Sequence, residues 1–109
     1  MSFQHTTLAK GRWQKLSLVE QMGNIGSEIG RAIKWQNKNE ELFWNAIERG
    51  FELLDLTIAD PRWRKRLKEL TRVREFLNDA ILGGKEYGSV LKDFEEYFFQ
   101  FAFAAQKNK

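Results

Sequence analysis

The sequence contains no cysteine, one histidine and one proline among its 109 residues. Without cysteine, disulfide bonds, thiolate zinc sites and thiol catalysis are excluded. No segment approaches the roughly 20 consecutive apolar residues of a membrane span, and the first residues lack the apolar centre of a secretion signal. We therefore expect a cytoplasmic protein that makes no membrane contact.

Groups that carry out catalysis or hold cofactors are also scarce. The only histidine is His5, and the Glu-x-x-His pairs that di-iron bundles require do not occur. The acidic pairs Glu40-Glu41 and Glu95-Glu96 are sequence neighbours, and adjacent residues do not share a helix face. The sequence predicts a nonenzymatic protein with no metal and no cofactor.

The chain is 42% hydrophobic and 30% charged, which is typical of a folded domain rather than a disordered segment. Its length fits a single domain over residues 1–109. Within that domain we expect residues 1–16 to form an N-terminal arm or short helix. Residues 106–109 are expected to form a tail.

Apolar residues recur at steps of three and four in four segments, which predicts four helices. The first begins after Ser17, because Ser17 followed by Glu20 is a capping box. The second runs from about Asn39 to Ile58 and ends before Asp60-Pro61. The apolar stripe of the first helix is Leu18, Met22, Ile25, Ile29 and Ala32, and that of the second is Phe43, Ile47, Gly50, Leu54 and Ile58.

The third helix is predicted to start at Pro61, with Asp60 as its cap, and to end at Gly83-Gly84. A turn through residues 85–88 then leads to Ser89, a candidate cap for the fourth helix. No alternating strand pattern competes with these helices. The predicted fold class is all-α, an up-and-down four-helix bundle.

Three glycines, Gly23, Gly26 and Gly30, lie three and four residues apart in the first predicted helix. A nucleic-acid-binding GxxG loop needs neighbouring strands, and a Walker loop needs a GK[ST] ending, so both readings are disfavoured. On a helix the three glycines share one face. Each costs up to about 1 kcal/mol relative to alanine, so we interpret them as helix-packing positions. A second backbone, or a bulky side chain such as Trp44 or Phe99, would approach closely there.

Charge is unevenly distributed along the chain. Residues 61–85 hold eight Lys or Arg and three acids, whereas residues 39–60 hold one Arg and six acids. A basic helix that also carries an aromatic residue is typical of nucleic-acid binding, and a solvated helix face is the alternative reading. The predicted contacts are Arg62, Arg64, Lys65, Arg66, Lys68 and Arg72, with Arg12, Lys15, Arg31 and Lys34 from the first helix and its approach.

The last predicted helix contains the aromatic run YFFQFAFAA. Phe99 and Phe103 lie away from its main apolar stripe, so the helix carries aromatic side chains on two faces. Apolar faces of this kind indicate burial against another subunit. We therefore predict a homo-oligomer with Phe99 and Phe103 at its interface.

The stretch EQMGNIGSEIGRAIKWQNKNEELFWNAIERGFELLDLTI, residues 20–58, resembles a known small-bundle family. That family contains the proteins encoded in 23S ribosomal RNA intervening sequences and the accessory variability determinant proteins of diversity-generating retroelements. The chain differs from the family pattern at residues 31–35. The residues that carry the resemblance are Gln21, Ser27, Ile29, Ile33, Ala46, Gly50, Glu52 and Leu53.

The resemblance implies a four-helix bundle that assembles into a homopentamer and has no catalytic residues. For the retroelement branch it also implies a basic surface that binds a reverse transcriptase and its template RNA. The resulting hypothesis is a nonenzymatic accessory protein that binds RNA or DNA, a reverse transcriptase, or both. The alternative is a homo-oligomeric interaction or scaffold module that binds no nucleic acid.

Overall fold

The computed structural model describes residues 11–84 and 90–107. Over these ranges the chain is helical and contains no strand, so the all-α class is confirmed. A search of the same ranges finds no helix that is both long and apolar enough to cross a membrane. The elements are α2 (Leu18–Trp35), α3 (Glu40–Ile58), η1 (Pro61–Arg66), α4 (Leu67–Ile81), η2 (Leu91–Asp93) and α5 (Phe94–Lys107).

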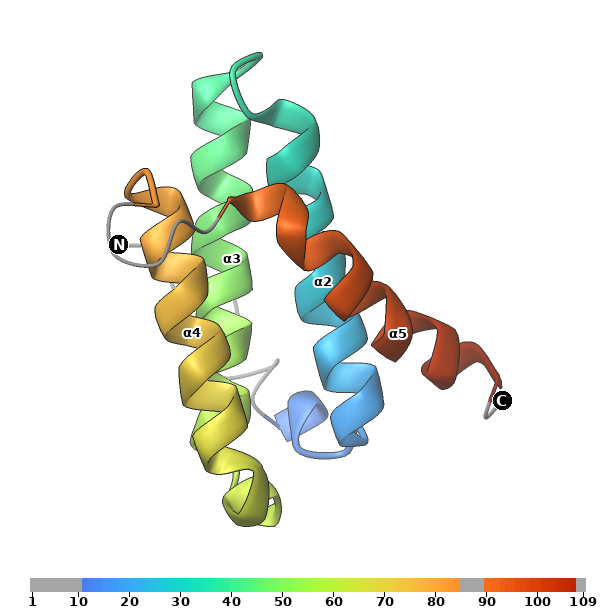
Figure 1. Ribbon diagram of the computed structural model, residues 1–109. Coiled ribbons are helices and arrows are strands. Elements are labelled where there is room, and N and C mark those ends of the chain that lie inside the picture. Colours follow the sequence, from blue (N-terminus) through green and yellow to red (C-terminus); the bar gives the residue numbers. More distant parts are fainter. Residues whose placement is uncertain (1–10, 85–89, 108–109) are drawn as a thin grey trace.

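The three helices α2, α3 and α4 lie side by side and alternate in direction (Figure 1). The last helix, α5, packs mainly on α2, which it crosses at a slant so that its C-terminal end points away from the other helices. Buried apolar side chains from all four long helices form one cluster. The four helices therefore share a single core.

The first two long helices begin where the sequence predicts, and they bury almost all residues of their predicted apolar stripes. Ser17 Oγ accepts from the Glu20 amide at 3.2 Å, while Glu20 Oε1 accepts from the Ser17 amide at 3.0 Å, which completes the capping box. Asn39 Oδ1 accepts from the Leu42 amide at 3.0 Å and caps α3. The α2 stripe is buried in full, and the α3 stripe is buried except for the half-buried Ile58.

The third predicted helix is wrong in its first part. Residues Pro61–Arg66 form a 3-10 helix, and the α-helix begins only at Leu67. Trp63 has φ −104° and ψ 23°, which breaks α-helical geometry. Its indole Nε1 donates to Gln21 Oε1 at 2.9 Å, so a tertiary hydrogen bond to α2 fixes this turn. The end of α4 matches the prediction, because Gly83 and Gly84 have positive φ values of 99° and 71°.

The start of the fourth helix differs as well. Its predicted cap Ser89 and the turn before it lie outside the described residues. The short helix η2 comes first, and Asp93 Oδ2 accepts from the Val90 amide at 3.3 Å. The α-helix then runs from Phe94 to Lys107, so residues 106 and 107 are helical rather than part of a tail.

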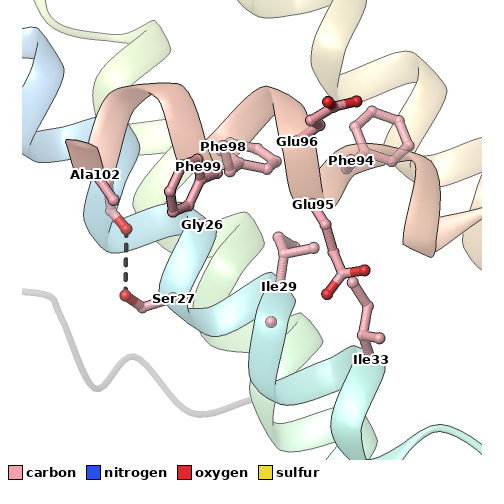
Figure 2. Close-up of a pocket in the computed structure, with 12 residues that line it drawn as sticks. Gly26, Ser27, Ile29, Ile33, Phe94, Glu95, Glu96, Phe98, Phe99 and Ala102 are labelled. Atoms are coloured by element: carbon pink, nitrogen blue, oxygen red, sulfur yellow. Dashed lines mark hydrogen bonds between the residues drawn. The ribbon is translucent and has the colours of Figure 1, made fainter. Parts of the chain in front are cut away.

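The glycines of α2 are not equivalent. A Cβ built on Gly26 would lie 2.6 Å from Phe98 Cβ, and one on Gly23 would lie 3.5 Å from Ala102 Cα, so α5 approaches α2 closely at both positions (Figure 2). The predicted partners Trp44 and Phe99 are exposed. Gly30 does not pack as expected, since a Cβ there would meet nothing within 4 Å. The slant of α5 leaves an open groove beside it.

Candidate nucleic-acid interface

A groove of about 690 Å³ lies between the basic segment and the start of α5. One wall comes from η1 and α4, and the other comes from η2 and α5. The residues that line it are Lys65, Arg66, Lys68, Glu69, Arg72, Val73, Phe76, Asp93, Phe94 and Tyr97.

Helical periodicity explains why these residues meet. Positions 68, 69, 72, 73 and 76 of α4 recur at steps of three and four, which places them on one face of that helix. Lys65 and Arg66 join them from the end of η1. The groove thereby gathers four of the predicted contacts, Lys65, Arg66, Lys68 and Arg72. Its acidic side chains are Glu69 and Asp93, so positive charge is in surplus.

Glu69 joins the two walls. Its Oε1 accepts from Arg66 Nη2 at 2.8 Å, and its Oε2 accepts from the Tyr97 hydroxyl of α5 at 2.9 Å. Burial and the hydrogen bond to Glu69 both raise the pKa of Tyr97 above its ordinary range. Tyr97 therefore stays a neutral donor at physiological pH, and its hydrogen bond to Glu69 connects α5 to α4 across the groove.

The other three basic side chains are available to a ligand. Lys65, Lys68 and Arg72 are exposed, and none of them forms an ion pair with another residue of the described ranges. Phosphate oxygens would meet these groups without first displacing a protein carboxylate. The rim of the groove thus presents unneutralised positive charge above half-buried aromatic side chains.

Arg62 serves the fold instead of the groove. Its guanidinium donates to Asp60 Oδ2 at 2.7 Å and to the Leu16 carbonyl at 2.9 Å, and it lies 4.4 Å from the centre of the Trp63 ring. These contacts tie the segment before α2 to the start of η1. Arg62 does not line the groove, and its Nε and Nη2 groups donate within the protein, so its contact with nucleic acid stays a prediction.

The remaining predicted contacts lie outside this groove. Arg64, Arg12 and Lys15 are exposed but do not line it. On α2, Arg31 pairs with the buried Glu28 at 2.8 Å, and Lys34 lies 5.1 Å from the centre of the Trp35 ring. The basic residues near and on α2 therefore do not line the groove that Lys65, Arg66, Lys68 and Arg72 line.

Sequence reasoning missed the aromatic part of the groove. Phe76, Phe94 and Tyr97 line it together with the basic side chains. Phe94 and Tyr97 are only half-buried. Their position follows from the slant of α5, for which the sequence carries no local signal.

The Asp60 carboxylate caps η1, the segment at which the groove begins. Because this carboxylate titrates, the contribution of the cap to stability can be tested as a function of pH. Asp60 is 6% exposed, and its hydrogen bond with Arg62 lowers its pKa against the opposing effect of burial. A lowered folded-state pKa stabilises the fold above the unfolded-state pKa of about 4, and that contribution is lost as the pH falls through the folded-state value. We expect Asp60→Asn, which keeps the capping oxygen, to lower the free energy of unfolding at pH 7.

The difference between wild type and Asp60→Asn should shrink as the pH falls below about 4. Urea unfolding of both proteins over a pH series measures it. Asp55→Asn is the matched control, because Asp55 also pairs with an arginine, Arg74 at 2.6 Å, but is exposed. A difference for Asp60→Asn that stays constant with pH would contradict the linkage.

No group of three or more His, Cys, Asp or Glu residues that could hold a metal ion occurs in residues 11–84 and 90–107. A scan against protein-family models, a search of curated proteins and a search of solved structures each found no match.

Proposed function

We propose that this chain is a four-helix bundle that binds single-stranded nucleic acid in the groove between α4 and α5. The observation that carries the proposal is the gathering of Lys65, Lys68 and Arg72 above Phe94 and Tyr97. Basic side chains neutralise phosphates, and aromatic rings stack on bases. The two kinds of group line one groove here, which is the pattern that single-strand-binding proteins use.

The concave shape favours a single strand over a duplex. Reading the bases of a duplex in its major groove uses a helix or ribbon that enters the groove. At about 690 Å³ the space between α4 and α5 is of a size to take one or two nucleotides. The half-buried rings present apolar surface inside it, and only unpaired bases can reach such surface.

The groove has no sequence-reading groups beyond its charges and rings, so we propose a nonenzymatic, accessory role with weak base preference. The family resemblance adds a reverse transcriptase and its template RNA as candidate partners. Co-purification of a reverse transcriptase with the tagged protein from its native cells, resistant to nuclease treatment, would support that partner. Loss of the enzyme on nuclease treatment would indicate that RNA alone connects the two.

Removing three charges from the groove tests the proposal. We expect the triple variant Lys65→Ala/Lys68→Ala/Arg72→Ala to bind a fluorescently labelled single-stranded RNA at least tenfold more weakly at about 100 mM salt. The slope of log K against log salt should become shallower by about 2, because each lost contact to a single strand contributes about 0.7. Fluorescence anisotropy over a salt series measures both quantities.

Arg12→Ala/Lys15→Ala/Lys34→Ala is the matched control. It also removes three positive charges, but from exposed positions outside the groove. Any change in affinity that it causes therefore reports only the general attraction of a basic protein for RNA. A triple groove variant that binds as tightly as the control would place the binding surface elsewhere. If the wild-type protein binds neither RNA nor DNA at the lowest salt, the proposal fails.

A second candidate function is a homo-oligomeric scaffold that binds no nucleic acid. The observation that favours it is the exposure of large apolar side chains on α5, where Phe99 and Phe103 are 65% and 59% exposed. Exposed aromatic pairs of this size are typical of protein interfaces. Self-association of a protein that fails the RNA measurements would support this function over the first.

A further inference from the structure

The C-terminal helix α5 is aromatic but mostly unburied. Within Phe94–Lys107 only Phe98 is buried. Phe99 and Phe103 lie on the side of α5 away from the core, and their rings stack on each other with centroids 6.3 Å apart and planes at 26°. In Figure 1 the C-terminal end of α5 extends beyond α2, and Phe99 and Phe103 are 65% and 59% exposed.

The apolar surface continues from Phe99 into a second groove. This groove, of about 480 Å³, lies between α2 and α5, and Gly30, Ile33 and Phe99 are among the residues that line it. Figure 2 shows Ile29 and Ile33 of α2 facing the start of α5 across it. The space beside Gly30 is unfilled, since a Cβ there would meet nothing within 4 Å. Phe99, Phe103 and this groove together form the α5 face.

The charges at the two ends of α5 indicate which kind of molecule binds the α5 face. Glu95 and Glu96 lie in its first turn, and Lys107 lies in its last. Positions 95, 99, 103 and 107 follow one another at steps of four, so the charges flank the aromatic pair along one side of the helix. Phosphates would be repelled by the acidic end, which disfavours nucleic acid as the occupant.

We infer that a second copy of this chain docks on the α5 face, with the two α5 helices antiparallel about a twofold axis. In that pairing Phe99 meets the partner's Phe103, and Phe103 meets the partner's Phe99. Because Glu95 precedes Phe99 by four residues and Lys107 follows Phe103 by four, each Glu95 then lies opposite the partner's Lys107.

The antiparallel arrangement is the one that the charges select. A parallel pair would place Glu95 against the partner's Glu95 and Lys107 against the partner's Lys107, and like charges disfavour that contact. A face that carries both signs about a central apolar pair is complementary to itself, which is the requirement for a closed twofold interface. The inference is independent of the nucleic-acid proposal, because it uses a different face.

Sedimentation equilibrium without nucleic acid tests the interface. We measure the wild-type protein from about 1 to about 100 µM, because a complex with a micromolar dissociation constant dissociates partly at the low end of this range. We expect a dimer at about 100 µM. Phe99→Gln/Phe103→Gln should raise the dimer dissociation constant at least tenfold and leave the helical circular dichroism unchanged, because both side chains are exposed. The triple groove variant Lys65→Ala/Lys68→Ala/Arg72→Ala should remain dimeric.

Charge reversal tests the register. Glu95→Lys and Lys107→Glu should each weaken the dimer, since each places like charges opposite one another twice. An equimolar mixture of the two variants should restore a dimer, because both contacts become attractive in the mixed pair. A wild-type monomer at about 100 µM, a pentamer such as the family resemblance implies, a dimeric double phenylalanine variant, or a mixture that stays monomeric would each overturn the inference.

Discussion

Gly26→Leu is expected to lower the free energy of unfolding by about 3 kcal/mol, the upper range for forcing extra carbon into a packed site. The first added atom would already lie 2.6 Å from Phe98 Cβ. Phe98 Cβ is bonded directly to the backbone, so a rotamer change of Phe98 cannot relieve the overlap. The helix α5 must therefore move away from α2. Urea unfolding followed by circular dichroism measures the effect.

The matched comparison is Gly26→Ala with Gly30→Ala. Alanine is the better helix former by up to about 1 kcal/mol, and nothing lies within 4 Å of a Cβ at position 30. Gly30→Ala should therefore stabilise the protein, while Gly26→Ala should destabilise it. If Gly26→Ala stabilised the protein as Gly30→Ala does, α5 would not press on α2 at Gly26.

Gln21→Met is expected to cost about 2 to 4 kcal/mol, because it leaves buried polar groups without partners. Gln21 is fully buried, and its Nε2 donates to the Trp13 carbonyl at 2.8 Å. Its Oε1 accepts from Trp63 Nε1 at 2.9 Å. Methionine fills a similar volume but can replace neither hydrogen bond, so the segment before α2 and the turn η1 lose their common anchor.

Gln14→Met is the control for this change. Gln14 is exposed, and an exposed substitution away from such contacts typically alters stability by no more than about 0.5 kcal/mol. Unfolding of the two variants and the wild type in urea, at one protein concentration, gives the comparison. Equal stabilities for Gln14→Met and Gln21→Met would show that the buried amide is replaceable.

The long helices were predictable because their signals are local. The α2 stripe from Leu18 to Ala32 follows the helical period, and the Ser17 capping box involves residues three apart, so neither depends on the rest of the fold. The Asn39 cap and the glycines that end α4 are local in the same sense. The approach of Lys68 and Arg72 on one face of α4 also follows from helical spacing.

Other features depend on contacts between distant segments and left no local signal. Trp63 bends η1 because Gln21, 42 positions earlier, accepts its indole hydrogen. Arg62 looks like its neighbours in the sequence, yet its Nη2 donates to Asp60 and to the Leu16 carbonyl, 46 positions earlier. Gly30 and Gly26 have the same sequence environment, and only the slant of α5 makes one of them crowded and the other open.

The Gln21 contacts also constrain the order of folding. They join Gln21 to Asp60 and Trp63, 39 and 42 positions away. A neighbouring hydrogen bond joins the Trp13 indole to Thr57, 44 positions away. Contacts of such separation carry a large loop-closure cost, whereas α2 and α3 are joined by a short turn. We expect the α2–α3 hairpin to form first and to bring these partners together. Gln21→Met should then accelerate unfolding while leaving the folding rate nearly unchanged.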